Sequence, residues 1–409
     1  MNKIIPRWTE PLLEKALSTM PVVVISGARQ TGKTTLVKKA KSCLKRKFLS
    51  FDDLDVLDQA KRSPDSLLNE LPVTIDEVQR YPDFLLSVKK KVDDQRNPGM
   101  ILLTGSANLA LMRGVSESLA GRALYVEQAP FCAAEWFGRT AVFTLIDAFF
   151  DKTMPLVARN DAQTSWESSF LSGGYPSVMQ LQSPEERSLW HSGYIKTYLE
   201  RDLRMLGEIS SIIDFQRLMR MAALRTARLL NQSELARDAG LSQSTCHRYL
   251  NLLETGYQIS RMHNLTLNRA KGLVKSAKLM WSDSGICANL AHMYNEEDVR
   301  GRADVGFWLE QHVFQTLQAW KASHYNASIH YWHQRPHEVD FVLQKDNRLV
   351  AIEIKLSSQI RTDDIKGLQA FQETFKRHFA VTRGIVIYSG KDMKDLGNDM
   401  LAVPIQSLT

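Results

Sequence analysis

The chain has 409 residues, of which 44% are hydrophobic and 24% are charged, a composition typical of soluble globular proteins. This length accommodates two or three domains, each large enough for its own core. The net charge of +7, from 52 basic and 45 acidic residues, permits nucleic-acid binding without demonstrating it. No apolar run approaches the ~18 residues needed to cross a membrane, and the N-terminus lacks the apolar core of a signal peptide. We therefore expect a cytoplasmic protein rather than a membrane protein.

The four cysteines are Cys43, Cys132, Cys246 and Cys287. They are scattered along the chain and form no C-x-x-C pair. This spacing favours reduced, buried thiols over a disulfide framework or a zinc site.

A phosphate-binding loop follows a short helix predicted over residues 7–18. The apolar run Val22–Ile25 leads into the pattern Gly-x-x-x-x-Gly-Lys-Thr, and a helical pattern follows. In such a loop, small residues let backbone N–H groups surround phosphate oxygens, and the helix N-terminus adds partial positive charge. Lys33 is expected to reach the β- and γ-phosphates of ATP, and the Thr34 hydroxyl to ligate Mg²⁺. The predicted nucleotide-binding residues of this loop are Gly27, Ala28, Arg29, Gln30, Thr31, Gly32, Lys33, Thr34 and Thr35.

A pair of carboxylates, Asp76 and Glu77, ends a second buried-strand run. In P-loop ATPases the first acid of such a pair holds the Mg²⁺ water shell, and the second can polarise the attacking water. An acidic pair after a strand is often only an exposed turn. Here it lies about 43 residues beyond Lys33 with a strand between, so we assign Asp76 to Mg²⁺ and Glu77 to the water.

Two further candidates follow the next strands. Ser106 and Asn108 come after the strand-like run Met100–Leu103, and polar residues at that end of a parallel strand face the ligand crevice. Ser106 is therefore the first candidate to sense the γ-phosphate and Asn108 the second, although either could cap a helix instead. Arg122 precedes the fourth strand, where its guanidinium could reach a neighbouring subunit's nucleotide. A surface salt bridge is a nearly equal alternative for Arg122.

The segments GARQTGKTTL, TIDEVQR, LLTGSAN and LAGR resemble one group of AAA-type ATPases. These are prokaryotic ATPases with an uncharacterised C-terminal domain of nuclease-like fold, and the resemblance extends from about residue 8 to residue 389. It implies ATP and Mg²⁺ as cofactors and a homo-oligomer, such as a hexameric ring, in which Arg122 acts on the adjacent subunit. The implied α/β architecture is a parallel-sheet P-loop ATPase domain over 1–148, a helical lid over 149–222, a winged helix-turn-helix over 223–278 and a PD-(D/E)xK nuclease-like domain over 279–409.

The segment Tyr194–Leu203 matches a hallmark of the same family. Its charged residues Glu200, Arg201 and Asp202 are flanked by apolar ones, which suggests a hinge or a subunit contact. The simpler interpretation, an amphipathic lid helix with a solvated face, is preferred.

A helix-turn-helix pattern starts near Leu229. Ser233 is expected to cap its first helix, Gly240 to form the turn, and Ser242 to cap a second helix over 243–254. The N-terminal half of that second helix is the end that normally enters a major groove of DNA. The exposed polar residues expected there are Gln243, Ser244, Thr245, His247 and Arg248.

A wing hairpin is predicted over residues 259–272, directly after that helix. Cations in and beyond it can contact DNA phosphates. They are Arg261, Arg269, Lys271, Lys275 and Lys278. Winged helices also serve purely as protein–protein modules, which is the alternative to DNA contact.

Charged residues mark three elements of the C-terminal region. Glu310 falls on the apolar stripe of a helix predicted over 307–320, where a carboxylate is costly unless a cation, a metal or a hydrogen-bond donor meets it. Asp340 lies on the next predicted strand, and Glu353 and Lys355 share one face of the strand after it.

This pattern resembles the PD-(D/E)xK nuclease fold, with Val339 where the usual proline precedes the aspartate. Asp340 and Glu353 could bind a hard divalent ion and Glu310 could complete its shell, while Lys355 orients a water for attack on phosphorus. The alternative is a nuclease-like fold that no longer cuts and instead grips DNA or a partner.

Together these features favour an ATPase that couples ATP hydrolysis to DNA binding, translocation or branched-DNA remodelling, because a motor needs sequence-tolerant backbone contacts. One alternative is an ATP-switched regulator that binds a protein partner through its C-terminal half. A further alternative is an ATP-dependent DNA endonuclease.

Overall fold

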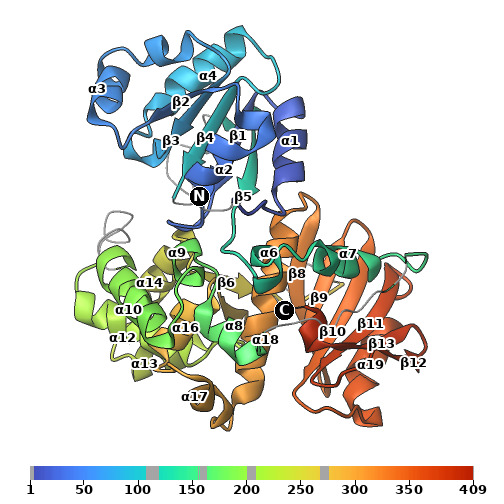
Figure 1. Cartoon of the computed structure of the whole chain (residues 1–409). Helices are drawn as coiled ribbons and strands as arrows, with labels where there is room; N and C mark the ends of the chain where they lie inside the picture. The colour runs from blue at the N-terminus through green and yellow to red at the C-terminus, as the bar shows by residue number, and fades with distance from the viewer. Residues whose placement is uncertain are drawn as a thin grey trace. The chain divides into compact units, whose positions relative to one another are not determined.

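The computed structural model describes residues 4–106, 119–154, 156, 164–199, 209–267 and 276–408. They form two compact units (Figure 1). The first comprises Met1–Pro130, Thr255–Tyr257 and Ala322–Tyr325, and the second comprises Phe131–Glu254, Gln258–Lys321 and Asn326–Thr409. Among the described residues, no helix has the length and apolar character needed to span a bilayer.

The first unit is built on a five-stranded parallel sheet with the order β2-β3-β4-β1-β5. Its central strands read as continuous apolar runs because helices cover both faces. The strands predicted from the sequence are all present. They are β1 (Val22–Ser26), β2 (Lys47–Ser50), β3 (Val73–Asp76), β4 (Ile101–Gly105) and β5 (Ala123–Glu127).

Alternate residues of β1 separate the helices of this unit into two layers. Val23 and Ile25 pack against α1 (Glu10–Thr19) and α2 (Lys33–Lys39). Val22 and Val24 face the opposite layer, which contains α3 (Leu54–Arg62) and α4 (Phe84–Asp94). Short 3₁₀ turns complete the unit at Lys41–Cys43, Pro64–Leu68 and Val78–Arg80.

The second unit begins with a helical part, in which the helices from residue 166 onward share one apolar core around Phe215, Leu250, Trp281 and Trp308. Its helices are α6 (Ala133–Trp136), α7 (Thr140–Ala148), α8 (Trp166–Ser172), α9 (Pro176–Met179), α10 (Pro184–Tyr194) with the π-helical turn Ile195–Leu199, α12 (Ile212–Ala223), α13 (Gln232–Asp238), α14 (Gln243–Thr255), α16 (Ser284–Leu290), α17 (Glu296–Arg300) and α18 (Val305–Ala322).

The segment 131–148, predicted with the ATPase domain, packs instead within the second unit. Asp147 accepts a hydrogen bond from the Trp320 indole at 3.2 Å, and the Ala148 carbonyl accepts one from Arg383 at 2.6 Å. These contacts join α7 to the C-terminal part of the chain.

The predicted helix-turn-helix corresponds to α13 and α14, with Gly240 at φ +66° between them. Ser242 caps α14 as expected, because its hydroxyl accepts from the Thr245 N–H at 3.1 Å. The predicted cap of α13 is wrong: Asn231, rather than Ser233, accepts from the Glu234 N–H at 3.2 Å. Two antiparallel strands follow, β6 (Ile259–Met262) and β7 (Lys278–Trp281). Strand β7 lies beyond the range 259–272 predicted for the wing hairpin, and residues 268–272 of that range lie outside the described residues, so the wing stays a prediction.

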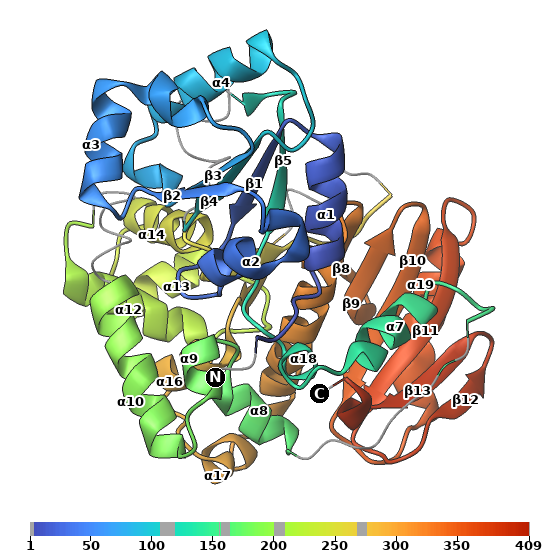
Figure 2. The same cartoon turned by 45° about the horizontal axis from the view of Figure 1, so that its top comes forward.

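The C-terminal part of the second unit is a six-stranded mixed sheet with the order β12-β13-β11-β10-β9-β8 (Figure 2). Helix α19 (Lys366–Phe375) covers one face, and α18 lies on the other, where Phe314 stacks on Phe341. The strands are β8 (Ala327–Gln334), β9 (His337–Lys345), β10 (Arg348–Lys355), β11 (Ala380–Tyr388), β12 (Lys394–Gly397) and β13 (Met400–Pro404).

Candidate functional site

The loop between β1 and α2 has the backbone that phosphate binding requires. A Cβ on Gly27, which has φ +153°, would collide with the carbonyl oxygen of Gln128, so only glycine fits there. Gly32 has φ +92° and begins α2. Arg7 donates to the Thr31 carbonyl at 2.8 Å and to the Ala129 carbonyl at 2.7 Å. Arg7 thus ties the loop to the end of β5, a role that sequence analysis missed because the contact joins segments far apart in the chain.

Lys33 is buried at the start of α2. Its ammonium donates to the Gly27 carbonyl at 3.0 Å and to the Ala28 carbonyl at 2.7 Å. Burial lowers the pKa of Lys33 to about 8, against the opposing influence of the carboxylates Glu77 and Asp76. Both hydrogen-bond partners are neutral, so the positive charge of Lys33 remains available to an anion.

Thr34 and Asp76 are adjacent, as predicted for a shared magnesium ion. The Thr34 hydroxyl lies 3.2 and 3.1 Å from the two carboxylate oxygens of Asp76. A second hydroxyl, that of Thr104 at the end of β4, also donates to Asp76. Sequence analysis gave no role to Thr104, although its place at the carboxyl end of a parallel strand was a usable signal.

Glu77 and Ser106 are also brought together, and Gln79 joins them. The Ser106 hydroxyl donates to Glu77 at 3.3 Å and accepts from Gln79 at 2.9 Å. The Gln79 amide donates to Glu77 as well, and its oxygen accepts from the Ser106 backbone N–H at 3.3 Å. Glu77 itself has a left-handed backbone, with φ +57°, which turns the chain directly after β3. Asn108, the second candidate, lies outside the described residues.

Arg122 forms a salt bridge within its own chain. The guanidinium donates to the two Asp93 oxygens at 2.7 and 2.9 Å and to the Ala120 carbonyl at 3.1 Å. The hydrogen bond to Asp93 raises the pKa of Arg122 and lowers that of Asp93. This geometry is the salt-bridge alternative, and action on a second subunit stays a prediction.

The predicted DNA-facing half of α14 is exposed at Gln243, Ser244, His247 and Arg248, and Thr245 is half-buried. The Arg248 guanidinium lies 5.4 Å from the centre of the Tyr249 ring. A row of polar and cationic side chains therefore faces outward along the helix.

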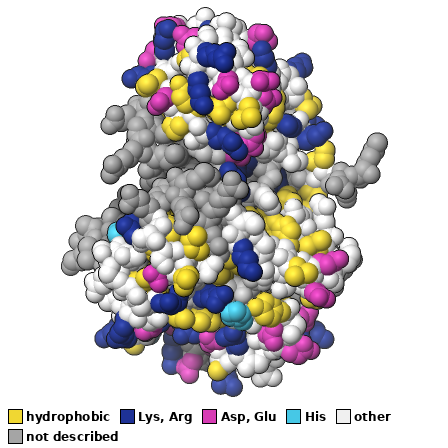
Figure 3. All heavy atoms as spheres, turned by 90° about the vertical axis from the view of Figure 1, so that its left-hand side faces the viewer, with side chains coloured by type: hydrophobic (Ala, Val, Ile, Leu, Met, Phe, Trp, Pro, Cys, Tyr) yellow, Lys and Arg dark blue, Asp and Glu magenta, His cyan; other side chains and the backbone are white. Residues whose placement is uncertain are grey.

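Two of the five cations predicted to contact DNA phosphates are engaged inside the protein. Arg261 pairs with Glu254 and donates to Asn251 at 2.7 Å, and Lys278 is buried. Both predictions are wrong, because each cation neutralises a carboxylate of its own chain. Outside the described residues lie Arg269, Lys271, Lys275, Glu200, Arg201 and Asp202. On the face in Figure 3, basic and acidic side chains are interspersed rather than separated into patches.

The predicted carboxylates Glu310, Asp340 and Glu353 meet in the second unit, together with Lys278. The Lys278 ammonium donates to Glu310 and lies 3.5 Å from Asp340 Oδ1. Asp340 Oδ2 accepts from the Ile354 N–H at 2.9 Å, and Glu353 Oε1 accepts from Lys355 at 2.7 Å.

The charge states of this cluster follow from its burial. Burial and the neighbouring Asp340 carboxylate raise the pKa of Glu310 to about 8, and the same two causes raise the pKa of Glu353 to about 8. Burial alone would lower the pKa of Lys278, but Glu310 and Asp340 more than offset it, so the pKa of Lys278 rises. Lys278 therefore stays charged at neutral pH.

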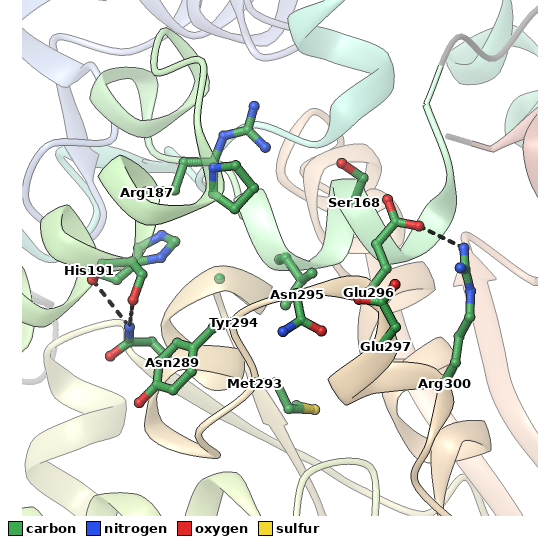
Figure 4. A pocket seen from close by; sticks show the side chains of 14 residues that line it. Ser168, Arg187, His191, Asn289, Met293, Tyr294, Asn295, Glu296, Glu297 and Arg300 are labelled. Atoms are coloured by element: carbon green, nitrogen blue, oxygen red, sulfur yellow. Dashed lines mark hydrogen bonds and ion pairs between the residues drawn. The ribbon is translucent and has the colours of Figure 1, made fainter.

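A separate cavity of about 290 Å³ lies among α8, α10, α16 and α17 (Figure 4). Its wall includes His191, whose pKa burial lowers to about 3, with repulsion from Arg187 adding to the effect. Arg300 closes one side through an ion pair with Glu296 at 2.6 Å. None of the predicted nucleotide-binding residues lines this cavity, so we do not assign ATP to it.

Comparison with protein families divides the chain into three matched segments. Residues 19–137 match the AAA domain family. This match supports an AAA-type ATPase domain in that segment. Residues 163–297 and 305–408 match two domain families of unknown function, DUF8612 and DUF4143 respectively.

The uncharacterized proteins Rv2008c of Mycobacterium tuberculosis and Mb2031c of Mycobacterium bovis are each 28% identical to this chain over 404 residues. The alignment covers 97% of this chain and 82% of each relative. Among solved structures, the Walker-type ATPase PABY2304 of Pyrococcus abyssi aligns at 16% identity and a TM-score of 0.45, over 70% of this chain and 96% of that one. The RuvB Holliday junction branch migration motor of Thermotoga maritima aligns at 18% identity and a TM-score of 0.30, over 66% and 96%.

Proposed function

We propose that this protein is a Mg²⁺-dependent ATPase that works on DNA as an oligomer. The observation that carries the first part is the convergence of Lys33, Thr34, Asp76 and Glu77 at the carboxyl ends of β1 and β3. In an open parallel sheet, ligands bind at this edge. The AAA domain match over residues 19–137 supports the same activity.

The donor set fits Mg²⁺ and a nucleotide. A hydroxyl and a carboxylate, from Thr34 and Asp76, lie within 3.2 Å of one another, and oxygen donors of this kind suit Mg²⁺. When bound, the ion neutralises charge on the β- and γ-phosphate oxygens. The Lys33 ammonium, which here donates to the Gly27 and Ala28 carbonyls, would hold phosphate oxygens of the nucleotide. Glu77 accepts hydrogen bonds and can orient and deprotonate a water. Ser106, bonded to Glu77, can report the γ-phosphate to that carboxylate.

Replacement of Lys33 tests the nucleotide site. Lys33→Ala should abolish ATP turnover, because no other lysine extends into the loop from the start of α2. Lys39→Ala, an exposed lysine of the same helix, is the matched control and should keep the wild-type rate. Wild-type turnover in Lys33→Ala would refute the site.

The exposed N-terminal half of α14 is the feature that supports DNA as the substrate of this ATPase. Its side chains combine hydrogen-bonding groups with the Arg248 cation, and a motor requires backbone contacts that tolerate any sequence. ATPase rates measured with single-stranded, duplex and branched DNA should rise with at least one of these. Arg248→Ala should weaken that stimulation without changing the rate in the absence of DNA.

An ATP-switched regulator of a protein partner is the second candidate. The internal pairing of Arg261 and Lys278 favours it, because these two cations are not available to DNA phosphates. An unchanged ATPase rate and no binding with any of the three DNA forms would select this candidate over DNA remodelling.

The oligomer part of the proposal gives Arg122 a role in trans, although its guanidinium is paired with Asp93 of its own chain. In a ring it would leave Asp93 and stabilise transition-state charge on the neighbouring subunit's nucleotide. Turnover per molecule should then rise with protein concentration, and Arg122→Ala should remove that rise. A rate per molecule that is constant over the whole concentration range would reject action in trans.

A further inference from the structure

The carboxylate cluster of the C-terminal part already contains a cation, Lys278. This residue belongs to β7, outside the six-stranded sheet, and its ammonium inserts between Glu310 of α18 and Asp340 of β9. The side chains of Lys278, Glu310 and Asp340 are only 11%, 11% and 13% exposed. The ring of Phe341 lies 5.8 Å from the same ammonium.

These residues do not fit a divalent metal. A hard ion needs several oxygen donors arranged around one point, at about 2.0–2.6 Å from it. The position facing Glu310 and Asp340 is taken by the lysine, and the other Asp340 oxygen is held by the Ile354 N–H. No group of three or more His, Cys, Asp or Glu side chains in the described ranges is placed to hold a metal ion.

Lys355 does not have the free ammonium that would orient a water. It donates to Glu353 Oε1 at 2.7 Å. The other oxygen of Glu353, Oε2, is buried and has no hydrogen-bond partner. Both lysines of the cluster, Lys278 and Lys355, are thus hydrogen-bonded to its carboxylates.

We propose that Lys278 takes the place that the resembling nucleases give to a metal ion, which makes this cluster a lysine-closed joint between β7 and the C-terminal sheet. The cluster then neither binds a divalent cation nor cuts DNA. Its role is structural, because it holds β7 against the six-stranded C-terminal sheet.

Further contacts, made by β7 and by the residues directly after β6, support such a joint. The Leu265 N–H donates to the Tyr331 carbonyl at 2.8 Å, and Asn264 exchanges hydrogen bonds with the His333 backbone at 3.2 and 3.1 Å. Gln311 of α18 exchanges bonds with the Trp281 backbone at 2.9 and 2.7 Å. Strand β7 is therefore hydrogen-bonded to α18, and the residues directly after β6 are hydrogen-bonded to β8.

Manganese binding to the full chain, without nucleotide, tests the inference. Mn²⁺ titrations followed by electron paramagnetic resonance should give the same curve for wild type and Asp340→Asn, so that any weak binding elsewhere cancels. A wild-type site that disappears in Asp340→Asn would overturn the proposal. This comparison does not require a variant at Lys278 to fold, and it is independent of ATP turnover.

Removal of the lysine provides the converse test. Lys278→Met should gain one Mn²⁺ site that Asp340→Asn abolishes in the double variant. Lys355→Met is the matched control, since it removes a lysine of the same cluster that does not lie between Glu310 and Asp340, and it should gain none. The proposal would be refuted if folded Lys278→Met gained no Mn²⁺ site, or if Lys355→Met gained an equal one. Lys278 would then not occupy the position of a metal ion.

Discussion

Lys33 and Lys278 are both buried lysines beside carboxylates, yet their surroundings act on them in opposite directions. Lys33 donates to two neutral carbonyls, and burial lowers its pKa to about 8. Lys278 bonds Glu310 and lies near Asp340, and these carboxylates raise its pKa despite burial. A buried cation is therefore available to a ligand only where the protein leaves its charge unneutralised. The phosphate loop does this, and the C-terminal cluster does not.

Replacing each lysine by methionine should change the ATPase rate very differently, and this is the largest expected difference between them. Lys33→Met should lower the ATPase rate roughly 1,000-fold, an effect at the upper end of what loss of one preorganised electrostatic donor causes. Lys278→Met should keep the rate within about twofold at temperatures where it is folded, because its charge is used inside the second unit. Steady-state phosphate release measures both. A comparable loss in folded Lys278→Met would mean that the cluster acts on the nucleotide site, and the comparison would fail.

The effects on stability should be the reverse, with the larger loss of folding free energy in the Lys278 variant. Lys278→Met should lower the free energy of unfolding of its unit by about 3–5 kcal/mol, because it leaves buried carboxylates without their cation. Chemical denaturation followed by circular dichroism provides the measurement. The control is Lys278→Met combined with Glu310→Gln, which should recover most of the loss, since a neutral pair removes the uncompensated charge. Equal destabilisation in single and double variants would point to lost packing instead of lost charge.

How much of this contrast the sequence predicts depends on the range of the contacts. The strands, the phosphate loop, Asp76 and Glu77 follow from local patterns, and the structure places each where the pattern predicts. The partner of Lys278 does not, because Glu310 is far along the chain and only tertiary packing joins them. The sequence alone therefore predicts, wrongly, that Lys278 contacts DNA as part of a basic segment.

The cap of α13 shows a smaller failure of the same kind. Asn231 and Ser233 are both competent caps, and local preference does not decide between them. The backbone position that begins the helix decides, and that depends on how α13 packs in the core through Leu235 and Ala236.

Because the charge of Lys33 is buried and unneutralised, it should make the free energy of unfolding depend on pH. The pKa of Lys33 is lowered from 10.5 to about 8 on folding. Between these values the unfolded chain holds the proton and the folded chain releases it, so stability rises with pH across this window. At pH 7 the folded, nucleotide-free protein bears the full cost, and Lys33→Met should be more stable than wild type by roughly 1–3 kcal/mol.

Denaturation of wild type and Lys33→Met at pH values from 7 to 10.5 would measure that difference. The gain in the variant should shrink steadily over the window. If the difference in stability did not depend on pH, the gain would come from packing and not from the buried charge of Lys33.

Gln79 should give the smallest effect, and it tests whether the nucleotide site is organised beyond its charges. This side chain holds both Ser106 and Glu77, so it fixes the carboxylate without contacting Lys33 or Thr34. Gln79→Leu keeps the volume but removes these bonds, and we expect kcat to fall up to about tenfold, the equivalent of one neutral hydrogen bond of about 1.4 kcal/mol. KM for ATP should stay unchanged, because phosphate binding depends on Lys33 and the loop backbone.

Gln79→Glu is the control variant for this prediction. It retains an acceptor for the Ser106 N–H but loses the amide donors and adds a charge beside Glu77, so its kcat should fall at least as far. A rise in KM with kcat unaltered in Gln79→Leu would instead place Gln79 in nucleotide binding, and charge alone would then suffice to position Glu77.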